Sequence, residues 1–551
     1  MIFYLPSNFN IMHVFSNLKR LTTTPTRLII MVSIFIILTG NFTFFDKLTD
    51  IYPWNYENIG FILSLGIFLS SLLVLITAFF NLLLPVRVVV SLMLLMSAAI
   101  GYYLDNLGVV IDIEMIRNII ETNISEASDL ITVNLMLRFI ILGLLPVFII
   151  WYMPINESNK LRELRYTLQL ATASFAIIFI SAFPFSDHYA SFFREHKPIR
   201  YYINPILALH SAGKYIKEIT KSTTKHKIKI LTNNPTIDVH SKKNELIIFV
   251  VGETARADHF SLDGYSRKTN PYLSSKQGVI SFTEISSCGT STAISVPCMF
   301  SYYKHDDFDS DVARNTENVL DILQRAGVSI LWRDNNSSSK GVASRIEYED
   351  FKSNNLNTIC DPECRDIGML VGLQAYINKQ QGDILIVLHQ MGSHGPAYYK
   401  RYPDNFNKFQ PACNTLELSS CTKEEITNAY DNTILYTDYF LSEVINFLKK
   451  NTPKYETTML YVSDHGESLG ESGIYLHGMP YIFAPKSQTN VPIIAWVSET
   501  SDVDFEKTIE FNDSPNSHDV LFATLLNAFE VRSDLDISDV KPLLYFKDEA
   551  Y

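Results

Sequence analysis

Five residues in the second half of the chain have side chains suited to metal chemistry: Glu253, His394, Asp464, His465 and His477. Glu253, Asp464 and His465 offer carboxylate oxygens and an imidazole nitrogen, a ligand set that suits Zn²⁺ or Mn²⁺. His394 and His477 could add ligands or hydrogen bonds. An isolated Asp-His pair is more simply an ordinary capping or surface pair. The whole set at one place would indicate a metal site.

A segment rich in hydroxyl groups lies between Cys288 and Cys298 and includes Thr290, Ser291 and Thr292. Such a hydroxyl is a poor nucleophile at neutral pH, but a divalent metal lowers its pKa and a helix N-terminus favours an anion. A disulfide between the two cysteines would hold the loop, and a shift of ~1 Å can cost ~100-fold in rate. A hydroxyl-rich capping turn is the alternative. The residues alone do not choose among the three hydroxyls.

Four short apolar runs precede candidate residues and are typical of buried strands: residues 246–251, 328–332, 384–388 and 459–462. They alternate with helical stretches, which predicts a parallel α/β sheet covered on both faces. Each run leads directly into polar residues. Ligands of open α/β sheets bind beyond the carboxyl ends of the strands, so the pattern predicts one active site there.

Composition divides the 551 residues into two parts. With 47% hydrophobic and 19% charged residues the chain is not a disordered one, and a net charge of −12 argues against nucleic-acid binding. The mean hydropathy of +0.08 is high for a soluble protein and low for one that lies in the membrane throughout. Residues 1–190 carry a net charge of −2 and the remaining 361 carry −10, so the average combines two different parts.

The first part contains five stretches without Asp, Glu, Lys or Arg: residues 28–45, 58–86, 88–104, 139–156 and 166–186. Each is close to the ~20 residues that cross a ~30 Å hydrocarbon layer. Five such runs within 190 residues argue against buried helices of a soluble protein. A cleaved signal peptide also fits poorly, because no A-x-A-like site follows the first run and four more runs come after it. We therefore predict five membrane spans.

Charges beside the spans predict their orientation. Seven basic residues flank the predicted cytoplasmic side, and the two loops on the other side hold two. This asymmetry places the N-terminus in the cytoplasm and the chain beyond about residue 187 outside. We expect a transmembrane domain at 1–187, a juxtamembrane connector and linker at 188–245, and a catalytic domain at 246–551. The flanking residues are Lys19, Arg20, Arg27, Arg87, Lys160, Arg162 and Arg165 against Lys47 and Arg117.

All six cysteines lie in the second part, and their spacing favours three local pairs. Six cysteines permit 15 connectivities, and free buried thiols are the alternative. An even set in an exported domain indicates disulfides in an oxidising compartment. The favoured pairs are Cys288 with Cys298, Cys360 with Cys364, and Cys413 with Cys421.

The predicted loop between spans three and four, residues 105–132, carries a polar stripe. Asn118, Thr122 and Glu126 follow an i, i+4, i+8 spacing and would share one face of a helix. This predicts an amphipathic helix at the outer membrane surface, with the stripe most simply a solvated face.

With these motifs in view, the sequence resembles the lipid A phosphoethanolamine transferases, including the mobile colistin-resistance enzymes. The matching strings are VVGETARADH at 250–259, SCGTSTA at 287–293, LWRDNN at 331–336 with Lys340, HQMGSHGP at 389–396 and VSDHGE at 462–467. The five-span layout and the cysteine spacing match too. The resemblance implies an alkaline phosphatase/sulfatase-type fold for the second part.

The resemblance implies roles for individual residues. Thr292 is similar to the nucleophile that becomes phosphoethanolaminylated, and with Glu253, Asp464 and His465 it would hold a catalytic zinc. His394 and His477 resemble histidines that bind the phosphate or a second zinc. The substrate-contacting positions implied are Ser337 and Lys340, and for the phosphatidylethanolamine headgroup Asn118, Thr122 and Glu126.

The implied activity is zinc-dependent transfer of phosphoethanolamine from phosphatidylethanolamine to a lipid A phosphate, with polymyxin (colistin) resistance as its consequence. We expect a monomer in the bacterial inner membrane with a periplasmic catalytic domain. Two alternatives are transfer to another lipopolysaccharide sugar and hydrolysis by a membrane-anchored phosphatase or phosphodiesterase. A sulfatase is disfavoured because the nucleophile loop has no C-x-P-x-R or S-x-P-x-R motif.

Overall fold

The computed structural model describes residues 22–122, 124–156, 159–222, 227–237 and 243–547, and these fall into two compact units. The first unit comprises Met1–Asp112 and Ile131–Gly213, and the second comprises Ile113–Leu130 and Lys214–Tyr551. The predicted loop between spans three and four therefore contributes Ile113–Leu130 to the second unit. Lys19 and Arg20, two of the orientation residues, lie outside the described residues.

The first unit is helical. Among the described residues, four helical stretches are long and apolar enough to cross a membrane, and a fifth candidate is a pair of helices bent by 63°. The prediction of an N-terminal membrane region with up to five spans is confirmed. The four stretches are α4 (Ile59–Asn81), α5 (Val86–Leu107), Val133–Tyr152, which contains α8 (Val133–Arg138) and α9 (Leu145–Tyr152), and Lys160–Glu195, which contains α10 (Lys160–Ala182) and α11 (Ser186–Glu195); the bent pair is α2 (Pro25–Gly40) with α3 (Phe42–Ile51).

The second unit is built on an eight-stranded sheet with the order β11-β3-β10-β7-β2-β6-β4-β5. The five strands from β7 to β5 are parallel, whereas β10 runs antiparallel to both of its neighbours. The four predicted strands are confirmed as β2, β4, β6 and β7. The bounds are β2 (Glu245–Gly252), β3 (Val279–Ser286), β4 (Ser329–Asp334), β5 (Glu347–Asp350), β6 (Ile384–His389), β7 (Glu456–Ser463), β10 (Asn490–Val497) and β11 (Asn516–Ser517).

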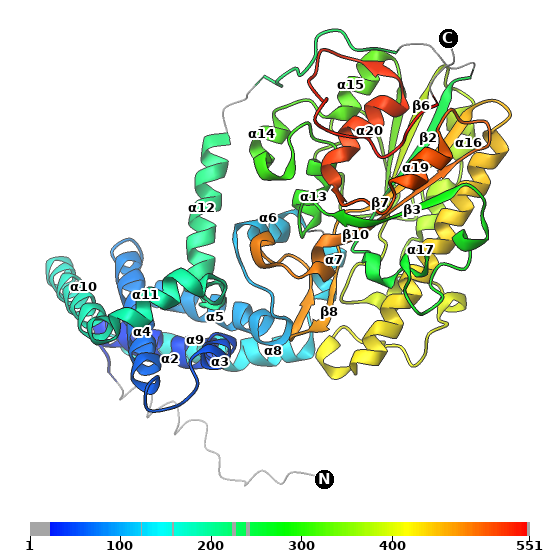
Figure 1. Ribbon diagram of the computed structural model, residues 1–551. Helices are drawn as coiled ribbons and strands as arrows, with labels where there is room; N and C mark the ends of the chain where they lie inside the picture. The colour runs from blue at the N-terminus through cyan, green and yellow to red at the C-terminus, as the bar shows by residue number, and fades with distance from the viewer. Residues whose placement is uncertain (1–21, 123, 157–158, 223–226, 238–242, 548–551) are drawn as a thin grey trace. The chain divides into compact units, whose positions relative to one another are not determined.

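Helices cover both faces of this sheet, as its strands require. All eight residues of β2 are buried, which a central strand can be only when both faces are covered. Figure 1 shows α15 and α20 on one side of the sheet and α17 on the other. The alkaline phosphatase/sulfatase-type α/β layout is thus confirmed. The bounds of its helices are α13 (Thr292–Met299), α14 (Ser310–Arg314), α15 (Val319–Ala326), α16 (Leu373–Ile377), α17 (Lys423–Asn451), α18 (Lys486–Thr489), α19 (Phe505–Glu510) and α20 (Leu521–Ala528).

The segment Ile113–Leu130 forms two short helices, α6 (Ile113–Glu121) and α7 (Ile124–Asp129). The expectation of one amphipathic helix carrying the whole polar stripe is therefore wrong. The Thr122 hydroxyl donates to the carbonyl of Asn118 at 2.6 Å, at the point where α6 has ended. Threonine competes for backbone groups in this way, which favours the end of a helix over its continuation.

Candidate active site

The predicted metal ligands meet at the carboxyl ends of β2 and β7. Glu253 follows β2, and Asp464 and His465 follow β7. The Nε2 atom of His465 lies 3.5 Å from Oε1 of Glu253 and 3.4 Å from Oδ2 of Asp464. One ligand atom from each residue lies within 4.8 Å of the other two, and all three side chains are buried. Adjacent parallel strands place these residues together, as the sequence predicts.

Thr292, the first residue of α13, faces this cluster. Its hydroxyl donates toward the Glu253 carboxylate, with 3.3 and 3.2 Å to the two oxygens, and lies 3.4 Å from Nε2 of His465. The Thr290 hydroxyl instead donates to the carbonyl of Met479 at 2.6 Å. The three-dimensional structure thus places Thr292 against the carboxylate and the imidazole, which the linear sequence left open.

The electrostatics of the cluster suit a divalent cation. Burial raises the pKa of Glu253 well above its usual value, and the neighbouring Asp464 charge adds to this effect. Burial also raises the pKa of Asp464. Its Oδ2 atom accepts no hydrogen bond from the described residues, although it is fully buried. Two buried carboxylates with an unsatisfied oxygen need a positive charge, so these residues fit a metal ion.

The surroundings of His465 favour a neutral imidazole, the form in which histidine can bind a metal. Its Nδ1 atom lies 2.9 Å from the carbonyl of Gly466, and because a carbonyl only accepts, Nδ1 must carry the proton. Burial lowers the pKa of His465 well below its usual value. The Nε2 lone pair therefore points toward Glu253, Asp464 and Thr292, which is the arrangement of a metal-binding histidine.

Further polar contacts fix the carboxylates. The Asn336 amide donates at 2.7 Å both to Oε2 of Glu253 and to the carbonyl of Gln390. The backbone N–H groups of His465 and Thr254 donate to Oδ1 of Asp464 at 2.7 and 3.2 Å. These contacts leave each carboxylate one well-defined orientation.

His394 and His477 lie beside this centre but have different partners. The His477 Nδ1 atom lies 2.8 Å from Oε2 of Glu467, which also accepts from the Tyr398 hydroxyl through Oε1 at 2.8 Å. His465, Glu467 and His477 form a second buried group with metal-ligand geometry, and among the described residues His394 is not part of it. Sequence reasoning did not single out Glu467, although it ends the string at 462–467 and stands two residues after a predicted ligand.

His394 instead pairs with the polar stripe. Its Nε2 atom lies 2.5 Å from Oε1 of Glu126 on α7, and its ring centre is 5.4 Å from that of His477. The stripe is therefore not a solvated face, because Glu126 contacts His394 of the same unit. Asn118 is half-buried on α6, and the Thr122 hydroxyl is engaged at the end of that helix.

Lys340 and Ser337 follow β4 in the same region. Lys340 is buried, has a positive φ of 50°, and its Nζ atom lies 3.5 Å from the carbonyl of Glu121. Ser337 is buried as well, and its backbone N–H donates to the side chain of Asn336. Lys340 thus brings a cation close to α6, while Ser337 adjoins the amide that holds Glu253.

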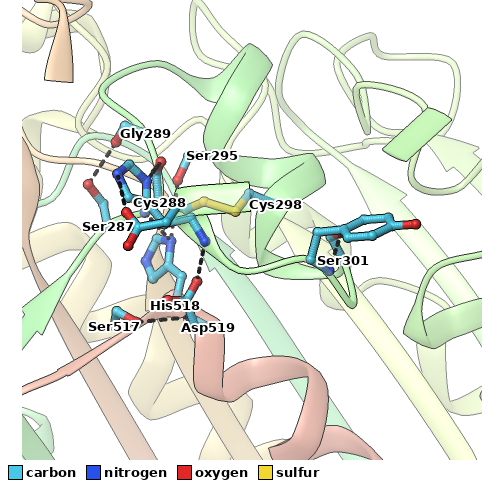
Figure 2. Close-up of a disulfide and its surroundings, with 12 residues drawn as sticks. Ser287, Cys288, Gly289, Ser295, Cys298, Ser301, Ser517, His518 and Asp519 are labelled. Atoms are coloured by element: carbon cyan, nitrogen blue, oxygen red, sulfur yellow. Dashed lines mark hydrogen bonds and ion pairs between the residues drawn. A yellow bond between two sulfur atoms is a disulfide. The ribbon is translucent and has the colours of Figure 1, made fainter. Parts of the chain in front are cut away.

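The loop closed by Cys288 and Cys298 is hydrogen-bonded to the segment Ser517–Asp519, as Figure 2 shows. All three predicted disulfides are present, and Cys288–Cys298 closes the loop. The backbone N–H of Cys288 donates to Nδ1 of His518 at 3.1 Å, and His518 Nε2 lies 3.0 Å from the carbonyl of Ser463. The Ser295 hydroxyl donates to the carbonyl of Asp464. His518, which sequence reasoning missed, therefore bridges the loop and β7.

Comparisons with known proteins agree with this geometry. Family models match residues 245–531 (Sulfatase) and 69–220 (Phosphoethanolamine transferase EptA/EptB). The chain is 44% identical to phosphatidylethanolamine transferase Mcr-1 of Escherichia coli, over 94% of this chain and 96% of that protein. It is 37% identical to phosphoethanolamine transferase EptA of Escherichia coli K12, over 92% and 95%.

A solved structure extends the likeness to both units. The integral membrane lipooligosaccharide phosphoethanolamine transferase A of Neisseria meningitidis matches with a TM-score of 0.88 and 34% identity, over 93% of this chain and 96% of that one. These matches, which cover 92–94% of the chain, include both the helical part and the α/β part. The chain belongs to the lipid A phosphoethanolamine transferase family.

Proposed function

We propose that this enzyme transfers phosphoethanolamine from phosphatidylethanolamine to a phosphate of lipid A through a covalent intermediate on Thr292. The observation that carries the proposal is the position of the Thr292 hydroxyl, 3.2 to 3.4 Å from the nearest atoms of Glu253 and His465 at the N-terminus of α13. A helix N-terminus favours the negative phosphoryl group that must approach this hydroxyl.

The reaction proceeds in two displacements. The Thr292 oxygen forms a bond to the phosphorus of the donor, the bond from phosphorus to the glycerol oxygen breaks, and diacylglycerol leaves with the proton that Thr292 gives up. A hydroxyl oxygen of the lipid A phosphate then bonds to the phosphorus, the bond to Thr292 breaks, and the Thr292 oxygen takes up the proton that the lipid A phosphate gives up. Positioning and charge stabilisation are the main contributions that a protein makes to such phosphoryl transfers.

Glu253, Thr292, Asp464 and His465 would hold at least one zinc ion, and His465, Glu467 and His477 could hold a second. Bound zinc lowers the pKa of a hydroxyl and offsets the charge of phosphoryl oxygens. Lys340 and His394 add positive charge for the phosphoryl group, and the Glu126 carboxylate attracts the ammonium of the donor headgroup. The Thr292 hydroxyl is oriented by its hydrogen bond to Glu253.

The catalytic unit faces the periplasm, the N-terminus lies in the cytoplasm, and the protein acts as a monomer in the bacterial inner membrane. The excess of basic residues on one side of the spans supports this orientation. Three disulfides in the second unit fit an oxidising compartment. An added ethanolamine ammonium reduces the attraction of lipid A for cationic polymyxins, which accounts for colistin resistance.

Mass spectrometry of lipid A from cells that express the enzyme tests this function. We expect the mass of lipid A to rise by one phosphoethanolamine, and the isolated enzyme to carry the same mass on Thr292 after incubation with donor alone. Thr292→Ala should abolish both signals, and Thr292→Ser, which keeps a hydroxyl, should retain the adduct at a reduced rate.

The alternative functions give different products. Unmodified lipid A with phosphoethanolamine on core sugars would identify another acceptor. Free ethanolamine phosphate without any modified lipid would identify a hydrolase. An adduct that persists in Thr292→Ala would refute the assignment of the nucleophile.

A further inference from the structure

We propose that Asp129 and Arg401 are positioning residues for the donor headgroup, because their buried ion pair fixes Glu126 on α7 relative to His394. This inference rests on the proposed function, since it assigns the Glu126 side of the site to the ethanolamine group. Neither residue belongs to a motif that the sequence indicates.

Asp129 ends α7 and is almost completely buried against the α/β domain. Its Oδ2 atom lies 2.9 Å from Nη2 of Arg401, and its Oδ1 atom lies 2.6 Å from Nζ of Lys400. Asp129 is 4% exposed and Arg401 is 5% exposed. A buried carboxylate is tolerated only when its charge is matched, so these contacts determine where the end of α7 can lie.

The same guanidinium also holds the backbone of His394. Arg401 Nε donates to the His394 carbonyl at 2.7 Å, while Nη1 lies 2.5 Å from Oε2 of Glu363, the residue before Cys364 in the Cys360–Cys364 disulfide loop. Arg401 thus binds three oxygen atoms in three directions. The planar guanidinium fork suits this arrangement, and the single ammonium group of lysine does not.

These contacts form a closed ring. Glu126 and Asp129 are three residues apart on α7, so they project from nearly the same side of the helix. Glu126 contacts the His394 side chain, Asp129 contacts Arg401, and Arg401 contacts the His394 backbone. The distance between the Glu126 carboxylate and the His394 imidazole is therefore set by the pair of Asp129 and Arg401.

Such a ring predicts an effect on donor binding and not on the transfer step. Thr292 begins α13 and its partners directly follow β2 and β7, and none of the hydrogen bonds that Asp129 makes with the described residues involves them. Loss of the Asp129 charge releases the end of α7, so Glu126 binds the ammonium less well, while attack by Thr292 on bound donor is unchanged. Loss of an interaction that only binds the donor raises KM and leaves kcat nearly constant.

The test uses the full-length enzyme in detergent with phosphatidylethanolamine as donor and a fixed, saturating concentration of lipid A as acceptor, and measures the steady-state rate of diacylglycerol release. Asp129→Asn keeps the side-chain shape, and we expect about a tenfold rise in the donor KM with kcat within about twofold of wild type. Arg401→Lys should raise KM similarly, because the single nitrogen of a lysine cannot reach the three acceptors that Nε, Nη1 and Nη2 contact. Glu499→Gln, which removes an exposed carboxylate of the same domain, should change neither constant.

A double variant separates positioning from general destabilisation. If Asp129 acts through Glu126, the Asp129→Asn change should alter KM by less than about twofold when Glu126→Gln is already present. An undiminished effect in that background, or a fall in kcat with unchanged KM, would overturn the inference. If Asp129→Asn does not fold, Lys400→Gln decides: a raised donor KM supports the inference and an unchanged one refutes it.

The two proposals fail in distinguishable ways. A wild-type enzyme that releases no diacylglycerol and forms no Thr292 adduct would refute the proposed function. A wild-type enzyme that does both, with an unchanged donor KM in Asp129→Asn, would refute only the role of the ion pair.

Discussion

Glu126 and His394 form a charged pair in which each residue changes the titration of the other. Burial disfavours the Glu126 carboxylate, but the charge and hydrogen bond of His394 outweigh it and lower its pKa to about 2. Burial also lowers the pKa of His394, and the Glu126 charge outweighs that effect and raises it. Each residue therefore favours the charged form of the other, and the pair holds α7 to the α/β domain.

A pH dependence of stability follows from this pair. Because the pKa of His394 is raised in the folded protein, its contribution to stability is complete below its pKa in the unfolded chain, about 6.5. This contribution is lost as the pH rises through the pKa of His394 in the folded protein. The lowered pKa of Glu126 means that its contribution is present above its unfolded value and is lost as the pH falls toward 2. The difference in Tm between wild type and Glu126→Gln should be largest at mildly acidic pH and shrink toward alkaline pH.

Thermal unfolding of both proteins across pH 5 to about 10 measures this difference in Tm. Groups that titrate elsewhere in the molecule affect both proteins equally, so their effects cancel in the difference. His394→Gln in place of Glu126→Gln serves as the matched variant and should give the same profile. A difference in Tm that stays constant with pH would mean that the pair is not charged as described.

At the scale of elements, helix α13, which begins at Thr292, is aligned with β7 by a residue from the far end of the chain. The parallel pairing of β11 with β3 sets Ser517 opposite Ser286 and so brings His518 beside Cys288. His518 accepts from Cys288 through Nδ1, so its Nε2 carries the proton that it donates to Ser463. Burial lowers its pKa to about 4, which keeps this neutral form at physiological pH.

We predict that His518→Phe slows formation of the Thr292 adduct by about 10- to 100-fold, because a small displacement of a nucleophile has a large effect on rate. The ring volume is retained, but the Cys288 N–H and the Ser463 carbonyl lose a buried partner, so Tm should fall as well. Single-turnover adduct formation measures the rate. His518→Asn, whose amide oxygen can accept a hydrogen bond from the Cys288 N–H, should recover part of the rate of adduct formation. A His518→Phe enzyme that forms the adduct at the wild-type rate would contradict the role of His518 in alignment.

The same elements show what the sequence could predict. Strands β2, β4, β6 and β7 were predictable because buried parallel strands are continuous apolar runs. Strand β10 was missed although its apolar residues are buried: it contains Pro492, and its pairing with β3 shifts register between Val491 and Ile493. Proline cannot donate to a ladder, so a strand that contains it gives a weak signal.

Long-range contacts limited the prediction of the site. The candidate metal ligands Glu253, Asp464 and His465 could be named because each closely follows a predicted strand. His518 carries no local signal, since its partner Cys288 is 230 residues away. The break between α6 and α7, and the docking of Asp129 on Arg401 across 272 residues, likewise depend on tertiary contacts that spacing does not reveal.

At the scale of the whole molecule, the chain combines a helical unit whose apolar side chains are exposed with an acidic α/β unit that holds every cysteine. All six cysteines are in disulfides, so the wild-type protein offers no thiol to a labelling reagent. Single introduced cysteines can therefore report on which side of the membrane a position lies.

We predict that a membrane-impermeant maleimide labels Glu499→Cys in intact cells with a permeabilised outer membrane, and labels Leu83→Cys only after the inner membrane is broken. Glu499 is exposed on the α/β unit, and Leu83, 69% exposed, lies in the turn between α4 and α5 beside Arg87. The positive flank of that turn assigns it to the cytoplasm. Because three of the candidate spans lie between Leu83 and the α/β unit, labelling of both positions from the same side would refute that number of spans, and labelling with the two sides exchanged would refute the orientation.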